Sequence, residues 1–239
     1  MNYKDNLKNG KSKIAVWGSG YIGLSTMAFF SKNKIKCVGF DIDQKKIDTI
    51  NSGNLPIKEL KDWFGFDIRN SVKKKYLQAT NDHNIFNDDS FIVHFVAIPT
   101  EKNGKPFFDI LFNVLKKLIT IIKRQNKIKP VIIIESTLTP QCSEKRIIPF
   151  FKRYNLVPGK DFIYGVAPRR DWFVEGTKSL VDIDRVFGST DKVSSKIIKN
   201  ILSIVCKNLH EASSHRVSEM VKSIENAYRH MEITLANQL

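Results

Sequence analysis

A glycine-rich turn near the amino terminus constrains the fold of this chain more than any other feature. Gly18, Gly20 and Gly23 form a G-x-G-x-x-G motif between an apolar strand expected at 13–18 and a helix expected at 21–32. The first glycine permits a tight turn, the second lets the backbone approach a pyrophosphate, and the third lets the helix pack closely on the sheet. Free N–H groups at the start of that helix attract an anion. The turn therefore predicts a βαβ unit that binds a dinucleotide.

An acidic residue stands where the second strand of such a unit ends. Asp41 follows Gly23 by 18 residues, near the spacing of about 20 residues expected for the carboxylate that binds a ribose hydroxyl. Because a carboxylate repels a 2′-phosphate, Asp41 favours NAD over NADP. The alternative is a doubly wound domain whose glycines serve packing alone, but strand, helix and acid together favour the dinucleotide.

Apolar runs and amphipathic segments alternate along the rest of the chain. Further strands are expected at 36–43, 91–98, 131–136, 162–167 and 185–188. Further helices are expected at 44–50, 71–79, 109–123, 143–153, 194–202 and from 217 to the end, with 51–70 mostly loop. Such alternation is typical of a parallel sheet covered by helices. The sequence predicts an α/β, doubly wound, mostly parallel Rossmann-like sheet over 1–212, followed over 213–239 by a long C-terminal helix.

The charge is strongly positive but is not concentrated in a motif. Lys and Arg number 39 against 24 Asp and Glu, which gives a net charge of +15. This charge suits an anionic partner, yet the lysines are spread over the chain as on solvated helix faces. The sequence has no zinc finger, aromatic RNA-binding motif or basic heptad region. Nucleic acid is therefore not expected as a partner.

Cysteine usage and hydropathy indicate the cellular compartment. Three scattered cysteines are too few for a disulfide framework or a zinc cluster, so we expect a reducing compartment and no metal. No apolar run reaches the ~18 residues that a membrane helix needs, and residues 1–13 have no apolar signal region. The sequence thus predicts a cytoplasmic protein without a membrane partner.

Two polar groups follow expected strands in the second half of the chain. Thr137, in the sequence Glu-Ser-Thr, lies where open α/β sheets bind ligands and could orient a substrate or a water; alternatively, these hydroxyls cap the next helix. Segment 167–176 mixes two arginines, two carboxylates and two aromatic residues. It is either a loop that binds phosphate or carboxylate or a structural loop with a local ion pair.

The expected C-terminal helix carries an apolar stripe and a Lys-x-x-x-Asn pair. Apolar residues recur at helical spacing: Val217, Met220, Val221, Ile224, Tyr228, Met231 and Leu235. Lys222 and Asn226 are four residues apart and lie on one helix face. Such a pair can polarise an alcohol oxygen and hold its proton, or it can be ordinary surface polarity.

Taken in order, these motifs resemble the UDP-glucose/GDP-mannose (nucleotide-sugar) dehydrogenase family. The resemblance covers nearly the whole chain and is more specific than any one motif. It rests on 18–24, 39–43, 55–57, 96–100, 135–137, 173–177, 185–188 and 218–222, with Asn226, Ala236 and Asn237.

The resemblance implies NAD-dependent oxidation of the C6 alcohol of a nucleotide sugar, of UDP-glucose or UDP-HexNAc type, to the uronate for polysaccharide biosynthesis. It implies NAD contacts from Gly18, Gly20, Tyr21, Ile22, Gly23, Asp41, Lys46, Pro99, Thr100 and Thr137. It further implies that Thr137 lies near the reacting carbon and that Lys222 and Asn226 stabilise the developing oxyanion. Asp171 is the residue expected in place of a family glutamate that acts in acid–base or water chemistry.

The chain is short for this family, in which a second domain follows the long helix and carries a nucleophilic cysteine. The sequence ends at Leu239 within the expected helix and has no such Gly-x-Cys motif, so we expect this chain alone not to complete the oxidation. Cys142 stands at an expected helix start, where a thiol pKa can be lowered, but is not expected to replace the nucleophile. Cys37 and Cys206 are expected in the core.

Two other interpretations remain open. One is a β-hydroxyacid-dehydrogenase-like NAD enzyme, which also combines a Rossmann domain with a Lys-x-x-x-Asn helix. The other is a non-catalytic NAD-binding module that dimerises through the last helix. A homodimer through this helix is expected under the family interpretation as well, because an uncovered apolar stripe is a liability.

Overall fold

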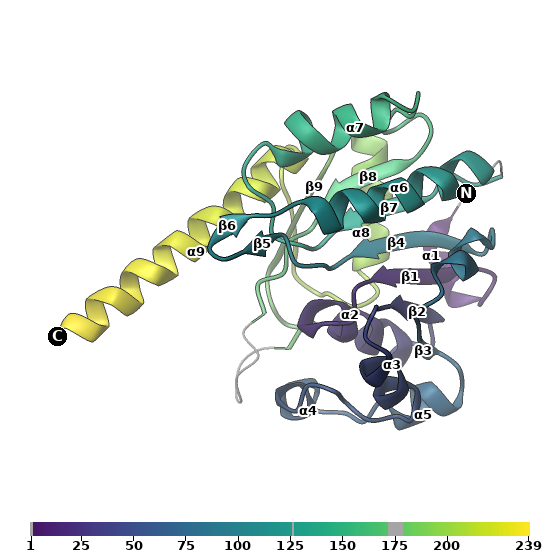
Figure 1. Ribbon diagram of the computed structural model, residues 1–239, viewed down its shortest axis with the longest axis horizontal. Helices are drawn as coiled ribbons and strands as arrows, with labels where there is room; N and C mark the ends of the chain where they lie inside the picture. Colours follow the sequence, from purple (N-terminus) through teal and green to yellow (C-terminus); the bar gives the residue numbers. More distant parts are fainter. Residues whose placement is uncertain (1, 126, 172–178) are drawn as a thin grey trace.

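The computed structural model describes residues 2–125, 127–171 and 179–239 (Figure 1). Trp172 and the 173–177 motif, both used in the resemblance, lie outside the described residues. The strands of the main sheet are β1 (Lys13–Trp17), β2 (Cys37–Phe40), β3 (Leu77–Thr80), β4 (Phe91–Val96), β7 (Val131–Ile134), β8 (Ile163–Val166), β9 (Arg185–Ser189) and β10 (Leu209–Glu211). A small antiparallel hairpin consists of β5 (Glu101–Lys102) and β6 (Lys105–Pro106).

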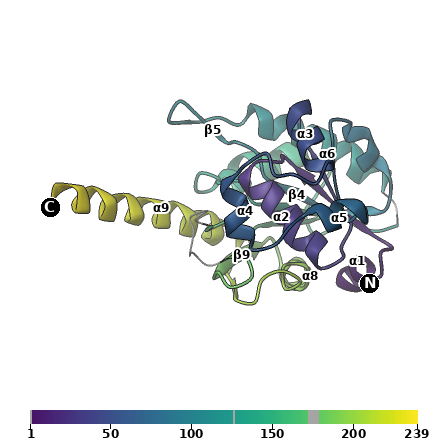
Figure 2. The ribbon, with the colours of Figure 1, turned by 90° about the horizontal axis from the view of Figure 1, so that it is seen from below.

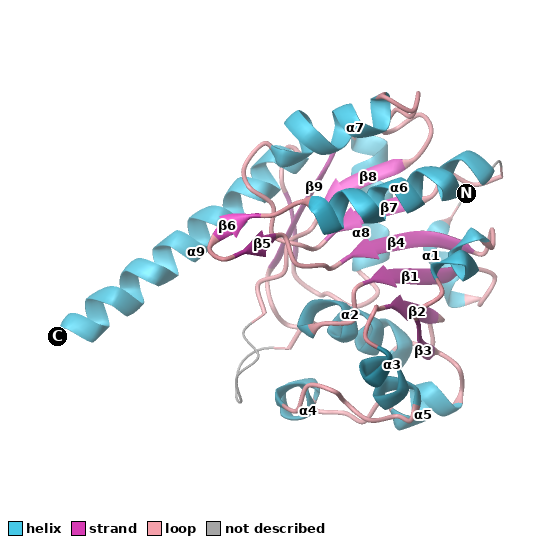
Figure 3. Ribbon diagram, in the orientation of Figure 1, coloured by secondary structure: helices cyan, strands magenta, loops and turns pink. Residues whose placement is uncertain are grey.

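Helices cover this sheet and extend beyond it (Figure 3). They are α1 (Tyr3–Lys8), α2 (Tyr21–Lys32), α3 (Gln44–Asn51), α4 (Glu59–Phe64), α5 (Arg69–Lys73), α6 (Asp109–Arg124), α7 (Ile148–Lys152), α8 (Lys192–Leu202) and α9 (His215–Gln238). Two shorter helical turns are η1 (His83–Asn87) and η2 (Ser143–Ile147).

The order of the strands confirms the predicted fold class. Among the described residues the sheet runs β10-β9-β8-β7-β4-β1-β2-β3, and the pairs from β3 to β8 are all parallel. Its β3-β2-β1-β4-β7-β8 part is the doubly wound Rossmann order. The chain order reverses between β1 and β4, and ligands of such sheets bind at that point, beyond the carboxyl ends of the strands.

The core has one layer on each side of the sheet. Successive strand residues point to opposite faces, so Val16 packs in one apolar layer and Trp17 in the other. The first layer includes side chains of α1, α2, α3 and α8, and the second includes those of α6 and α7. Burial of both faces explains why the central strands are continuous apolar runs rather than alternating ones.

Several local expectations were wrong. Residues 71–79 were expected as a helix, but Lys75 takes a positive φ of 56° and the chain continues as β3, which pairs with β2. The 51–70 segment, expected as mostly loop, contains α4 and the start of α5. The helix α1 was not predicted. The antiparallel pairing of β9 with β8 agrees with a sheet predicted to be mostly parallel.

The last helix leaves the body of the protein, as Figures 1 and 2 show. Its first turns pack against β8 and β9, where Ser218 and Glu219 are buried. Farther along, Ile224, Tyr228 and Met231 are 58–63% exposed. No helix among the described residues is both long and apolar enough to cross a membrane.

Candidate functional site

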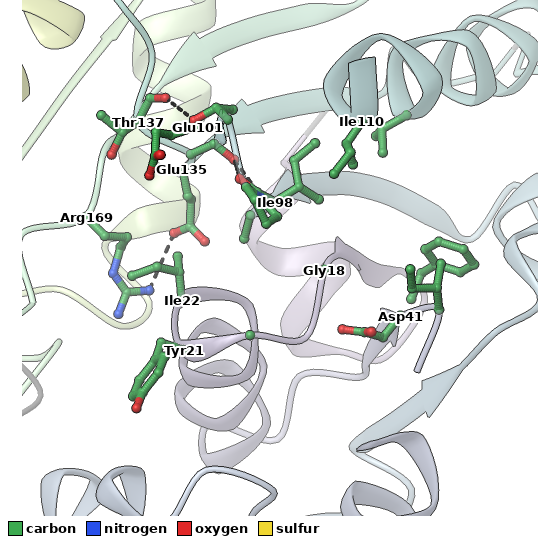
Figure 4. A pocket seen from close by; sticks show the side chains of 18 of the residues that line it. Gly18, Tyr21, Ile22, Asp41, Ile98, Glu101, Ile110, Glu135, Thr137 and Arg169 are labelled. Atoms are coloured by element: carbon green, nitrogen blue, oxygen red, sulfur yellow. Dashed lines mark hydrogen bonds and ion pairs between the residues drawn. The ribbon is translucent and has the colours of Figure 1, made fainter. Parts of the chain in front are cut away.

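A cavity of about 820 Å³ opens at the carboxyl ends of β1, β2, β4 and β7 (Figure 4). Most of the residues predicted from the sequence line it: Gly18, Gly20, Tyr21, Ile22, Asp41, Lys46, Pro99, Thr100, Thr137, Asp171 and Lys222. Gly23 is buried behind the glycine turn, and Asn226 is exposed one helical turn beyond Lys222. The structure thus brings together residues from both halves of the chain at the switch point of the sheet.

The glycine turn has the geometry of an anion cradle. Gly18 has a φ of 95°, and a Cβ on Gly23 would overlap the carbonyl oxygen of Gly18, so both positions require glycine. Around Gly20, by contrast, no described heavy atom outside Gly20 and its two chain neighbours lies within 4 Å of the place a Cβ would take. Gly20 is also the N-cap of α2, and no side chain in the described part of the chain caps this helix. Open space and uncapped N–H groups therefore coincide where a pyrophosphate would bind.

Asp41 is held rigidly at the end of β2. Its Oδ2 accepts hydrogen bonds from the backbone N–H of Ser19 and from Nζ of Lys46, both at 2.9 Å. Its Oδ1 accepts one from the N–H of Asp43 at 3.1 Å. Burial alone would raise the pKa of Asp41, but these donors and the charge of Lys46 lower it below its usual value. A fixed, ionised carboxylate suits the recognition of ribose hydroxyls.

Hydroxyl groups tie the loops after β4 and β7 together. Oγ of Ser136 accepts from the N–H of Ile98 at 2.9 Å and donates to its carbonyl oxygen at 2.8 Å. Oγ1 of Thr100 donates to the carbonyl oxygen of Thr137. The Ser136 hydroxyl is used here rather than as a helix cap, because the next helical segment begins only at Ser143. The side chain of Thr137 remains on the cavity wall, where the sequence predicted it.

A buried charge cluster closes the other end of the cavity. It comprises Glu135, Arg169, Asp171 and Arg185, whose side chains are at most 2% exposed. Arg169 pairs with Asp171 and Glu135, and Arg185 pairs with Glu135. Arg169 also donates to Ser25 and Thr26, so the loop after β8 is bound to α2. Burial would lower the pKa of Arg169, but Asp171 and Glu135 raise it above its usual value.

This cluster decides between the two interpretations of the 167–171 part of the segment. Two arginines and two carboxylates neutralise one another, so the described part forms a structural ion-pair network. Sequence reasoning missed Arg185 as a member and left Glu135 without a role. The available signal was a charged residue directly beside an apolar strand, because such a charge needs a partner once it is buried.

Lys222 approaches the cavity from α9. Burial lowers the pKa of its ammonium group, although the nearby carboxylates of Glu225 and Asp171 act in the opposite direction. Arg170 forms an ion pair with Glu225, which connects the loop after β8 to the same helix. Lys222 thus brings an ionisable ammonium group to the cavity wall, whereas Asn226 is not among the described residues that line it.

The three cysteines are all buried. The expected location of Cys37 and Cys206 in the core is confirmed. The possibility of a lowered thiol pKa at Cys142 is wrong, because burial and the charge of Glu219 raise its pKa to about 11. A thiol with that pKa stays protonated at neutral pH and is a poor nucleophile.

Comparison with known proteins agrees with this geometry. Residues 12–205 match the family model described as the UDP-glucose/GDP-mannose dehydrogenase family, NAD binding domain. The Staphylococcus aureus protein CapL is 34% identical over 235 residues, which are 95% of this chain and 51% of CapL. A UDP-N-acetyl-D-mannosamine dehydrogenase of Methanococcus aeolicus is 31% identical over 241 residues, 95% of this chain and 50% of that protein.

Solved structures show the same relationship. The UDP-D-ManNAc dehydrogenase of Pyrococcus horikoshii superposes with a TM-score of 0.82 at 27% identity, covering 95% of this chain and 52% of that one. The chain thus spans about half the length of the relatives it matches. The glycine turn and the carboxylate of Asp41 lie at the switch point of the sheet, within the residues that the family model matches. The chain therefore belongs to the UDP-glucose/GDP-mannose dehydrogenase family and contains its NAD-binding domain.

Proposed function

We propose that this chain is the NAD-binding part of a dehydrogenase that oxidises the C6 alcohol of a UDP sugar to the uronate in polysaccharide biosynthesis. The observation that supports this best is the cavity at the switch point, with uncapped N–H groups at one end and Lys222 at the other. The names of the relatives favour a UDP-N-acetylhexosamine over UDP-glucose as substrate, because UDP-N-acetyl-D-mannosamine dehydrogenases recur among them.

The cavity suggests a place for each part of NAD. The pyrophosphate would lie over Gly20 against the N–H group of Ile22, beside Tyr21, while Gly23 supports the turn from behind. Asp41 and Lys46 would bind the adenine ribose. Pro99, Thr100 and Thr137 would contact the nicotinamide, as the corresponding loops meet there. Bound NAD would supply the hydride acceptor.

The remaining residues would act on the proton of the substrate alcohol or position the groups that do. Lys222 has a lowered pKa, so its ammonium can give up a proton more readily and can stabilise an alkoxide that forms beside it. Asn226 would assist from the next turn of α9. Asp171 is neutralised by Arg169, so we assign it to positioning the loop beside Lys222 rather than to carrying a proton.

Domain organisation is part of the same proposal. We assign 1–212 to the NAD-binding domain and 213–239 to the start of a connecting helix. Because the relatives are about twice as long, we expect complete oxidation to need sequence equivalent to their other half. The exposed apolar residues of α9, including Ile224 at 59% and Met231 at 63%, favour a homodimer through this helix.

Calorimetric titration of the intact chain with NAD⁺, followed by UDP-N-acetylmannosamine and UDP-glucose, tests the cofactor and substrate assignments. We expect saturable NAD⁺ binding and, in the presence of NAD⁺, no uronate from this chain alone. Absence of a heat of binding at millimolar NAD⁺ would contradict the proposal. Robust uronate formation would contradict the expectation that this chain alone does not complete the oxidation.

Sedimentation velocity tests the dimer. We expect a dimer for the wild-type chain and a monomer for the Ile224→Glu/Met231→Glu double variant, because charge in an apolar helix interface is costly. The matched control is Glu232→Gln on the same exposed helix, which should remain dimeric. A wild-type chain that stays monomeric at high concentration contradicts the dimer.

A further inference from the structure

Lys46 provides a positive charge at the end of the cavity where the adenine ribose would bind. Its Nζ lies 2.9 Å from Oδ2 of Asp41, and its side chain is only 25% exposed. Lys46 comes from the first turn of α3, directly after the loop that carries Asp41. Among the described residues, the other cations that line this cavity are Arg169, from the loop after β8, and Lys222, from α9. Figure 4 draws Arg169 on the opposite side from Asp41.

The acceptor sites of Asp41 are mostly occupied by groups of the protein itself. A carboxylate offers about four lone-pair sites. Two donors, the Ser19 N–H and Lys46 Nζ, occupy Oδ2, and the Asp43 N–H occupies Oδ1. About one site remains for a ribose hydroxyl, and Lys46 has its charge balanced by Asp41. The lysine thus lies beside the carboxylate that would face the ribose, but its charge is already neutralised by that carboxylate.

We propose that Lys46 is a latent ligand for a 2′-phosphate, and that the Asp41–Lys46 ion pair, acting as a unit, sets the preference for NAD. The proposal rests on the proposed function, since it takes the crossover cavity as the dinucleotide site. Loss of the Asp41 carboxylate would remove the repulsion of a phosphate. It would also free an ammonium with three N–H donors and the backbone N–H of Ser19, which together form a cation-and-amide site for phosphate.

The neighbouring charges limit what this site can do. Asp43 also lines the cavity, but its Oδ1 caps α3 by accepting the N–H of Lys46 at 3.3 Å, so its carboxylate is partly balanced by the helix. Lys45 lies beside it in the sequence and is exposed on α3. Lys46 and Lys45 therefore form a matched pair of lysines, of which only Lys46 contacts Asp41 in the described structure.

The test measures the affinities of the intact chain for NAD⁺ and NADP⁺ by calorimetry at one low salt concentration. We expect Asp41→Ser to weaken NAD⁺ and to strengthen NADP⁺ by roughly 10- to 100-fold, the range for one or two charge-assisted hydrogen bonds. Asp41→Ser/Lys46→Met should lose that gain, whereas Asp41→Ser/Lys45→Met should keep most of it. Asp41→Asn, which keeps the side-chain shape, should give a smaller gain of the same sign.

Thermal unfolding of each variant shows that it is folded before its affinities are compared. The inference is overturned if the gain for NADP⁺ is equal with and without Lys46, or if neither Asp41 variant gains affinity for NADP⁺ while the wild-type chain binds NAD⁺. A wild-type chain that binds neither dinucleotide contradicts the proposed function itself, so the two failures are distinguishable.

Discussion

The two ends of the cavity use polar groups in opposite ways. At the glycine turn, the first N–H groups of α2 have no side-chain cap, and Gly20 faces open space among the described residues. At the other end, Glu135, Arg169 and Asp171 are buried and paired with one another. The first end offers backbone N–H groups that a ligand can use. At the second end the charges pair with one another, and Oδ1 of Asp171 and Nε of Arg185 are its buried polar atoms without a described hydrogen-bond partner. A dense group of charges in a sequence is therefore a weaker sign of a binding site than a few donors left without partners.

The largest effect should come from breaking the closed end. Arg169→Met leaves the carboxylate of Asp171 buried without its guanidinium and removes the bonds to α2, so the free energy of unfolding should fall by about 3–5 kcal/mol. Urea unfolding at neutral pH measures this. The matched control is Arg170→Met, since the Arg170 side chain is 35% exposed and its pair with Glu225 should contribute less than about 1 kcal/mol. Equal losses for the two variants would show that the cluster is not structural.

An acid titration should reveal the effect of a buried histidine on stability. His94 is fully buried in β4, where burial lowers its pKa from 6.5 to about 4. Between these two pKa values His94 is protonated in the unfolded chain but neutral in the folded chain. The free energy of unfolding should therefore fall by about 3 kcal/mol in total as the pH falls from about 6.5 to 4.

The His94→Leu variant tests the assignment of this acid sensitivity. This variant should lack the loss of stability that protonation of His94 causes at acid pH. The carbonyl oxygen of Phe91, which His94 contacts, keeps the hydrogen bond donated by Gln125. Stability curves of the two proteins against pH give the comparison. Parallel curves between pH 6.5 and 4 would contradict the role of His94.

The open end should respond in binding rather than in stability. Gly20→Ala places a methyl group where the pyrophosphate would approach, so NAD⁺ affinity should fall about 10-fold or more, while the free energy of unfolding changes by about 0.5 kcal/mol. Calorimetry and urea unfolding measure the two quantities. Gly23→Ala is the contrast, because its Cβ would overlap Gly18 and should lower stability as well. If Gly20→Ala binds NAD⁺ as the wild type does, the cradle is misassigned.

The smallest effect concerns a buried carboxylate outside the cavity. Glu219 is 1% exposed and accepts the N–H of Ser143 at 2.9 Å, and burial raises its pKa. Because the folded pKa lies above the unfolded one, ionisation of Glu219 opposes folding at neutral pH. Glu219→Gln should therefore gain about 0.5 kcal/mol at pH 7 and nothing below the unfolded pKa. A loss of stability at pH 7 would mean that the charge itself is required.

The same contrast explains what the sequence could predict. The glycine turn, β2 and Asp41 follow from local steric rules and from a fixed spacing, so the bounds of β1, α2 and β2 were predicted to within three residues. The pairing of Arg185 with Glu135 joins residues 50 positions apart, and no local pattern specifies it. The segment now seen as β3 was misread because its strand character depends on pairing with β2 rather than on its own composition.

A nitrogen–proton correlation spectrum of the intact chain during NAD⁺ titration tests the central claim most directly. The amide signals of Gly20 and Ile22 should shift strongly and saturably, because both residues line the place where the pyrophosphate would bind, while that of Arg185 in the closed cluster should move little. Saturable shifts centred on the closed cluster, or no shifts at the turn with millimolar NAD⁺, would contradict the account.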